Sequence, residues 1–199
     1  MKKQNRITGK SNNSGFTLIE MVVSFALLAL FLVAATRVIS YTIGIYYAAR
    51  GNSDGMQVAG VIYNKVSGQI EGALHAANPS VTGGDDGIDS ISFIDATGSR
   101  VTISASPQKT GEDLTEGNYV NIHYDAVTEG SVHYEDVDWR FDKDAYMGYT
   151  VKELRFEDPG DDYPDNVLRM TLVLHNGRYG DYTTSYYIKC VNADSIDFN

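Results

Sequence analysis

The stretch GFTLIEMVVSFALLALFLVAAT, residues 15–36, decides what kind of chain this is. From Phe16 to Thr36 it contains 21 residues and one acid, Glu20. As a helix these residues reach about 31 Å, which matches the roughly 30 Å hydrocarbon core of a bilayer. The stretch therefore predicts a membrane-spanning helix with a single carboxylate near its beginning.

The flanking residues predict the orientation of this helix. The leader MKKQNRITGKSNNSG, residues 1–15, is hydrophilic, and all of its charges are positive. Positive charge beside a span favours the cytoplasmic side, so we expect a cytoplasmic N-terminus and an exported C-terminal part. Arg37 follows the apolar run at the outer interface, where its long side chain reaches water.

Charge and cysteine content limit what the exported part does. The 199-residue chain has a formal net charge of −10, which becomes −14 without the basic residues of the leader. So acidic a body repels phosphate backbones, and we expect no nucleic-acid partner. Cys190 is the only cysteine, so no disulfide forms within the chain.

Two ordinary explanations of the apolar stretch leave observations unexplained. A secretory signal peptide cut after Val33–Ala35 would precede a polar segment, but apolar and aromatic residues continue through VISYTIGIYYAA, residues 38–49. A plain membrane anchor accommodates Glu20, because Thr17 and Glu20 have the spacing of a helix capping box. It does not explain Gly15 or the abrupt change from polar leader to apolar run.

The segment GFTLIE, residues 15–20, placed after a basic leader and before an apolar helix, resembles the N-terminal segment of type IV prepilins and type II secretion pseudopilins. The resemblance implies that prepilin peptidase cleaves between Gly15 and Phe16 and methylates the new amine of Phe16. It also implies an ion pair between the Glu20 carboxylate and the Phe16 ammonium of a neighbouring subunit or of the same chain. Because an unpaired buried charge is costly, such a pair selects the axial register of a filament.

The resemblance also implies partners and a location. The partners are prepilin peptidase, other pilin or pseudopilin subunits and an assembly platform protein, and the protein lies in the cytoplasmic membrane as a single-pass protein or on a cell-surface filament. No proline lies between Phe16 and Ala77, and a C-terminal cysteine pair is missing, which favours a minor subunit over a major pilin. Pilus, secretion pseudopilus and DNA-uptake filament all remain open. So does a different class, a membrane-anchored extracellular binding protein that enters no filament.

Beyond the membrane the helix is expected to continue with one apolar side. A stripe recurs every four residues at Val58, Ile62, Val66, Ile70 and Leu74. The helix is expected to end at about Ala76, because the residue before Pro79 disfavours helix.

The stretch GNSDG, residues 51–55, interrupts the predicted long helix, and a kink or break of the helix there is one possibility. It also matches G-x-S-x-G, the nucleophile elbow of α/β-hydrolases. That elbow needs a preceding strand and a large parallel sheet, which the sequence does not predict. A polar hinge at Ser53 is the favoured interpretation.

After Ser80 the apolar pattern changes to the period of two that is typical of β-strands. The runs are DSISFIDA, RVTISAS, NYVNIHYD, SVHYEDVDWRF, YTVKELRFE, VLRMTLVLHNG and TTSYYIKCV. Cys190 lies on the apolar face of the last run, as a small core residue. The predicted fold is α+β: one long N-terminal helix, membrane-spanning in its first half, packs its second half on a C-terminal antiparallel β-sheet. The predicted parts are a leader (1–15), the span (16–36), the exported amphipathic half of the helix (37–77) and the β-rich domain (78–199).

The residues give no indication of an enzyme. None of the four histidines has a His or Cys partner at metal-ligand spacing. The segment 142–153 has some acids of an EF-hand loop, but Met147 stands where that loop requires glycine.

Two acidic loops are candidates for calcium, because clustered oxygen ligands suit that ion. Their aspartates are Asp85, Asp86 and Asp89 in the first loop and Asp158, Asp161, Asp162 and Asp165 in the second. Aspartates in turns are more often solvated turn formers, so the expectation is no cofactor, with calcium as the alternative.

Overall fold

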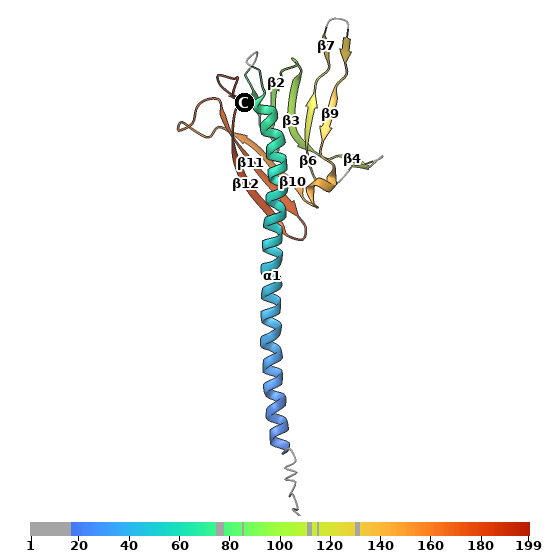
Figure 1. The fold of residues 1–199 in the computed structure, drawn as a ribbon, viewed down its shortest axis with the longest axis vertical. Helices are drawn as coiled ribbons and strands as arrows, with labels where there is room; N and C mark the ends of the chain where they lie inside the picture. Colours follow the sequence, from blue (N-terminus) through green and yellow to red (C-terminus); the bar gives the residue numbers. More distant parts are fainter. Residues whose placement is uncertain (1–16, 75–77, 85, 111–112, 115, 130–131) are drawn as a thin grey trace, which may run out of the picture. The chain divides into compact units, whose positions relative to one another are not determined.

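The computed structural model describes residues 17–199 except 75–77, 85, 111–112, 115 and 130–131. The predictions for the leader, for Gly15 and Phe16, and for Asp85 lie outside the described residues. The chain divides into two compact units, Met1–Tyr46 and Tyr47–Asn199. A single helix, α1 (Leu18–Glu71, 54 residues), belongs to both units, and all strands belong to the second (Figure 1).

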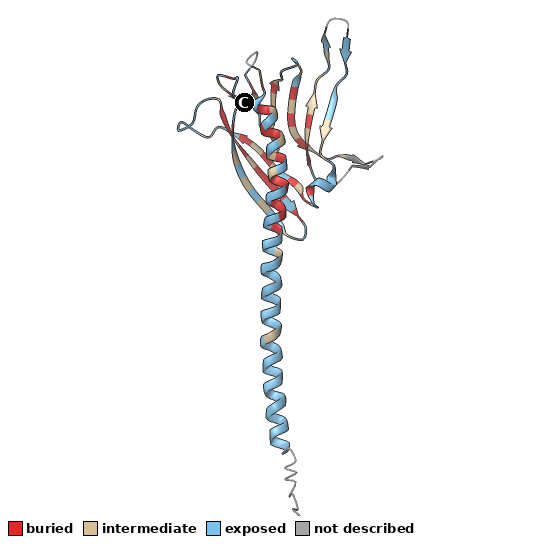
Figure 2. Ribbon diagram, viewed as in Figure 1, coloured by how far each residue is buried: buried red, intermediate tan, exposed pale blue. Residues whose placement is uncertain are grey.

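In the first unit α1 is long and apolar enough to cross a membrane. Its large apolar side chains are exposed along the whole of the described segment, as the pale blue colour of Figure 2 shows. Leu18 and Phe31, for example, are 85% and 68% exposed. An apolar surface of this extent needs a lipid or protein environment.

In the second unit the apolar stripe of α1 is buried, as predicted. Val58, Ile62, Val66 and Ile70 are all 2% exposed or less. The helix ends at Glu71, earlier than the predicted end at Ala76. Gly72 follows it, in the position after a helix where glycine is favoured. The main-chain N–H of Leu74 then donates to the carbonyl oxygen of Ile94 at 2.7 Å, so the chain has already left the helix to join a sheet.

The stretch 51–55 neither breaks α1 nor forms a hinge, because the helix continues through it. Both of its glycines lie against aromatic side chains. A Cβ atom at Gly51 would be 2.7 Å from Cβ of Tyr179, and one at Gly55 would be 2.6 Å from Cγ of Tyr182. The glycines therefore permit a close approach of helix and sheet. Since Ser53 lies within a helix, it is not on the strand-to-helix turn that a nucleophile elbow requires.

The strands form two main sheets and two short hairpins. The six-stranded sheet has the order β13-β1-β2-β3-β6-β9. Its strands are β1 (Ser80–Thr82), β2 (Ser90–Ile94), β3 (Arg100–Ser106), β6 (Tyr119–Tyr124), β9 (Val137–Arg140) and β13 (Asp197–Phe198). All neighbours pair antiparallel except β1 and β13, which are parallel.

The second sheet is three-stranded and fully antiparallel, in the order β10-β11-β12. Its strands are β10 (Thr150–Glu157), β11 (Val167–Asn176) and β12 (Gly180–Lys189). A short 3₁₀ helix, η1 (Lys143–Tyr146), precedes β10. The hairpins are β4 (Lys109–Thr110) with β5 (Asp113–Leu114), and β7 (Val127–Glu129) with β8 (Val132–Tyr134).

The predicted α+β class is confirmed, with two differences in detail. The β region holds two main sheets, where the sequence predicted one. The run 131–141, predicted as one strand, is two, because β8 pairs with β7 whereas β9 pairs with β6. Between them lie Glu135 and Asp136, both exposed, outside either strand.

The two main sheets meet along β10. Single bridges join Ile88 to Leu154 and Asn118 to Val151. A common apolar core includes the stripe of α1 and residues of both sheets, seen as red segments in Figure 2. Cys190 is part of this core and fully buried, as predicted, and its burial raises the pKa of the thiol to about 11.

Candidate functional site

The first described turn of α1 contains a closed set of hydrogen bonds between Thr17 and Glu20. The main-chain N–H of Thr17 donates to Oε2 of Glu20 at 2.8 Å, and its hydroxyl donates to the same oxygen at 3.0 Å. In return, the main-chain N–H of Glu20 donates to the Thr17 hydroxyl oxygen at 3.3 Å. This is the reciprocal arrangement of a capping box, which satisfies N–H groups that a helix start leaves unpaired.

The carboxylate of Glu20 is at the same time open to a second partner. Both Thr17 and Glu20 are exposed, and only Oε2 of Glu20 takes part in the hydrogen bonds with Thr17. A carboxylate offers about four lone-pair directions, so the cap leaves acceptor capacity unused. The geometry at the head of α1 is thus compatible with a cap in the single chain and with an ion pair to another group.

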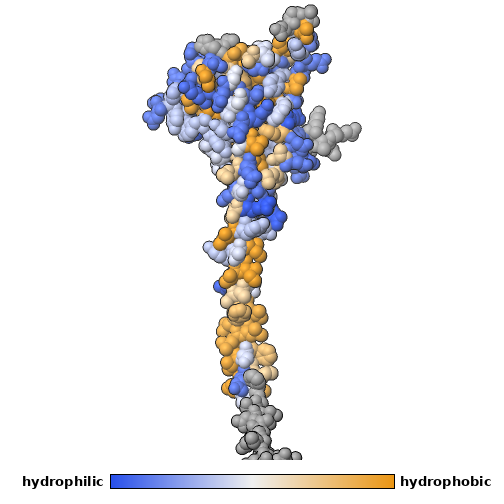
Figure 3. Space-filling model, viewed as in Figure 1, coloured by the Kyte–Doolittle hydropathy of each residue, from blue (hydrophilic) through white to orange (hydrophobic). Residues whose placement is uncertain are grey.

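Apolar residues follow this polar turn from Met21 to Ala35, with Ser24 as the one polar residue among them. They appear as the orange part of α1 in Figure 3. The large exposed ones include Leu18, Ile19, Val22, Val23, Phe25, Leu27, Leu28, Leu30, Phe31, Leu32 and Val33. A helix that is apolar on every side is typical of a membrane span.

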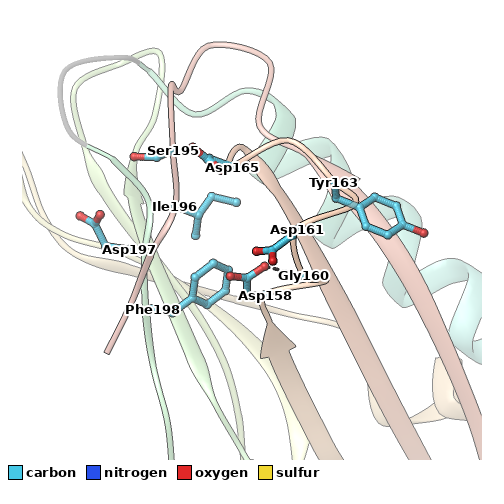
Figure 4. A pocket seen from close by; sticks show the side chains of 9 residues that line it. All are labelled: Asp158, Gly160, Asp161, Tyr163, Asp165, Ser195, Ile196, Asp197 and Phe198. Carbon is cyan, nitrogen blue, oxygen red and sulfur yellow. Dashed lines mark hydrogen bonds between the residues drawn. The ribbon is translucent and has the colours of Figure 1, made fainter.

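The second acidic loop, between β10 and β11, borders a cavity of about 360 Å³ that residues 195–198 also line. Asp158, Asp161, Asp165 and Asp197 line it, whereas Asp162 does not. Oδ1 of Asp158 accepts the main-chain N–H of Gly160 at 2.8 Å, as in an ordinary aspartate turn. In Figure 4 the Asp197 carboxylate points away from those of Asp158 and Asp161.

In the first acidic loop Asp89 has a structural position. Its side chain is buried, with Oδ2 accepting the N–H of Phe156 at 2.9 Å and Oδ1 lying 3.4 Å from Nη1 of Arg155. Oδ1 also accepts the N–H of Gly84 at 3.2 Å. Asp89 thereby connects the two main sheets. Asp86 is exposed on the preceding turn.

The described residues bring no three His, Cys, Asp or Glu side chains together as a metal-binding group. In the segment that resembles an EF-hand, Asp142 caps η1 by accepting the N–H of Asp144 at 2.9 Å. Glu153 lies within β10. This segment therefore has helix and strand geometry in place of a calcium loop.

Sequence reasoning missed one group of residues, those that fasten α1 to the sheets. Tyr149 donates its hydroxyl to the carbonyl oxygen of Gly51 at 2.7 Å, while Tyr179 and Tyr182 contact the two glycines. The spacing of Gly51 and Gly55, one helical turn apart, was the available signal for a close packing contact.

Comparison with known proteins gives one match, over the N-terminal segment. Residues 10–36 match the family model described as the prokaryotic N-terminal methylation motif. Neither a curated protein nor a solved structure matches the chain. The predicted resemblance to type IV pilins and pseudopilins is thus confirmed for this segment, while the minor subtype stays a prediction. The chain carries a prokaryotic N-terminal methylation motif in residues 10–36, consistent with a membrane-anchored, pilin-like protein of the type IV pilin and pseudopilin family.

Proposed function

We propose that the chain is a minor pilin-like subunit of a type IV pilus, a type II secretion pseudopilus or a DNA-uptake filament. Prepilin peptidase cleaves it between Gly15 and Phe16 and methylates Phe16, and the platform protein of the machine then brings it to other subunits. Its role is structural, and the exported part lies outside the cytoplasmic membrane.

The observation that carries this proposal is the length of exposed apolar surface on α1 behind a single carboxylate. Val38, Ile39, Ile43 and Ile45 are exposed although they lie past Arg37. A helix rises about 1.5 Å per residue, which puts Ile45 about 40 Å from the start of α1 at Leu18 and past the roughly 30 Å hydrocarbon core. Neighbouring helices of a filament would cover these side chains.

The free-energy cost of placing the Glu20 carboxylate in a membrane supports the same proposal. A carboxylate in a membrane-spanning helix costs about 2.5–3.5 kcal/mol on insertion scales. The Phe16 ammonium of a neighbouring subunit would offset this cost and fix the register between the two helices. In the single chain the Glu20 carboxylate accepts hydrogen bonds from Thr17. On assembly the remaining acceptor sites of the carboxylate bind the ammonium of the partner.

The experiment compares two variants that separate the cap from the ion pair. Glu20→Gln keeps the capping box, because glutamine serves at that position, but it removes the charge. Thr17→Ala removes the hydroxyl of the cap and keeps the charge. Crosslinking to other pilin-like subunits in membranes should fall strongly for Glu20→Gln, since loss of one partner of a buried pair costs about 3–5 kcal/mol. It should persist for Thr17→Ala.

The alternative is a membrane-anchored extracellular binding protein that enters no filament. It predicts that neither variant changes crosslinking to pilin-like subunits, because Glu20 then acts only as a cap. Cleaved chain that crosslinks to no other pilin-like subunit, in wild type as in both variants, would favour this alternative.

A further inference from the structure

The β7–β8 hairpin exposes apolar side chains that nothing in the described chain covers. Its two strands pair only with each other, as a separate two-stranded sheet. Val132 and Tyr134 are 49% and 55% exposed, and orange patches lie on this part of the surface in Figure 3. An isolated two-stranded hairpin is marginally stable in water, so a covering partner would stabilise this one.

Beside the hairpin lies a groove of about 450 Å³. Its apolar walls are Tyr124, Val127, Tyr134 and Val137, which come from β6, β7, β8 and β9. Thr97 and Ser99, on the turn between β2 and β3, also line it, as do Asp125 and Glu135. The volume lies within the range of 300–1,000 Å³ that is usual for binding pockets.

All charged residues that line the groove are acidic. Asp125 and Glu135 are its only charged lining residues, and none of the eight lining residues, all in the described part of the chain, is basic. Asp125 lies 3.3 Å from Nε2 of His123, whereas Glu135 is exposed. The carboxylate of Asp138 already accepts hydrogen bonds from His123 and Asn121, and these bonds hold its pKa below its usual range. The groove therefore suits a ligand with positive charge next to apolar groups.

The neighbouring strand suits a ligand in extended form. β9 is the last strand of the six-stranded sheet, and in the described residues its only strand partner is β6. Its free edge offers main-chain groups to an added strand, a common mode of peptide recognition. Val137 belongs both to this edge and to the groove, so one extended segment would reach both.

We propose that the groove and the β9 edge together bind an extended segment of a partner protein that carries basic and apolar side chains. Its apolar side chains pack on the apolar walls of the groove, and its basic side chains pair with Glu135 and Asp125, which line the same groove. A second copy of this chain is a poor occupant, because its net charge is −10. The site is independent of whether the chain is built into a filament.

The test measures peptide binding to the full chain in nanodiscs of neutral lipid by fluorescence anisotropy. The probe is the peptide KVKLKVKL, and its matched control is EVELEVEL. Two variants change the groove, Tyr134→Ser and Glu135→Lys. Each groove variant has a matched control. Val132→Ser removes an apolar side chain of the same hairpin outside the groove, and Asp161→Lys makes the same change of net charge in a distant loop.

The proposal expects the basic probe to bind, more weakly at high salt, and the acidic peptide not to bind. Each groove variant should weaken binding of the probe by roughly tenfold, because Tyr134→Ser removes an apolar wall of the groove and Glu135→Lys reverses one of its two charges. Val132→Ser and Asp161→Lys should bind as the wild type does. Equal binding of the two peptides, no binding of the basic probe, or equal weakening by groove and control variants would overturn the proposal. So would self-association of the chain that Tyr134→Ser abolishes, because the occupant would then be a second copy.

Discussion

The hydroxyl of Tyr149 donates a 2.7 Å hydrogen bond to the carbonyl oxygen of Gly51, which joins α1 to the start of β10 across 98 positions of sequence. The bond is buried, and the ring of Tyr179 covers the same glycine. Gly51 therefore has two contacts, and the one with Tyr179 depends on its lack of a side chain. These contacts hold the C-terminal half of α1 against the three-stranded sheet.

Alanine at Gly51 or Gly55 should destabilise the fold, although alanine favours helix. The new Cβ atom would lie within 2.7 Å of Tyr179 or Tyr182, and overpacking of this kind costs about 1–3 kcal/mol. Gly60→Ala is the matched control, because no atom lies within 4 Å of a Cβ there. Thermal unfolding in detergent should give lower melting temperatures for the first two variants and a slightly higher one for Gly60→Ala. A higher melting temperature for all three would contradict the packing described.

Removing a buried hydroxyl should cost more at Tyr146 than at Tyr149. The Tyr146 hydroxyl accepts the buried main-chain N–H of Val120 at 2.8 Å, and phenylalanine would leave that donor unpaired. A buried unpaired donor costs about 1–3 kcal/mol, against about 0.5–1.5 kcal/mol for an ordinary hydrogen bond. Denaturant unfolding of Tyr146→Phe and Tyr149→Phe measures both. A larger loss of unfolding free energy for Tyr149→Phe than for Tyr146→Phe would contradict this, and would mean that the main-chain N–H of Val120 finds another acceptor in Tyr146→Phe.

Chelation should leave the melting temperature unchanged. Asp89 is bonded to Phe156 and Arg155, and Asp158 closes its own turn. Thermal unfolding with calcium and with EDTA checks this. Binding to the native state alone would add about 2.7 kcal/mol at a hundredfold excess over Kd. A marked fall of the melting temperature in EDTA would therefore establish calcium in one of the acidic loops.

Cys190 should react with iodoacetamide only after unfolding. Its burial raises the pKa of the thiol from 9.0 to about 11, so little of the reactive thiolate is present at neutral pH. A raised pKa means that the stabilisation from the protonated thiol is complete below about pH 9 and is lost as the pH rises towards 11. Labelling followed by mass spectrometry should show protection at pH 8 and a faster reaction as the pH approaches 11. Equal labelling rates in native and denatured samples at pH 8 would be inconsistent with a buried thiol.

The sequence predicted those parts of the fold that follow from local patterns. The stripe from Val58 to Ile70 and the β-type run that became β11 each follow from the residue pattern of a single element. The stripe is buried, and so are Leu168, Met170, Leu172 and Leu174 of β11. The way the two main sheets meet depends on contacts between segments far apart in the chain, such as the bridge between Ile88 and Leu154, and no local pattern specifies such contacts. The role of the stretch 51–55 depended in the same way on Tyr179, more than a hundred positions away.

The residues of the candidate sites also differ in whether a local pattern of sequence could predict them. The N-terminal segment is short and ordered, so its resemblance to prepilins could be seen in the sequence and agrees with the motif matched at residues 10–36. The role of Asp89 was not visible in its loop, because its partners Arg155 and Phe156 belong to another sheet. The groove beside the β7–β8 hairpin combines four strands and for the same reason had no local signature.

The mature N-terminus tests the proposed function most directly. The measurement is mass spectrometry of the chain purified from membranes of cells that contain prepilin peptidase, with a Gly15→Lys variant as the control. The account predicts a chain that begins at Phe16 and carries one methyl group on its amine, and an uncut leader in the variant. A wild-type chain that begins at Met1 or at Thr36 would contradict it.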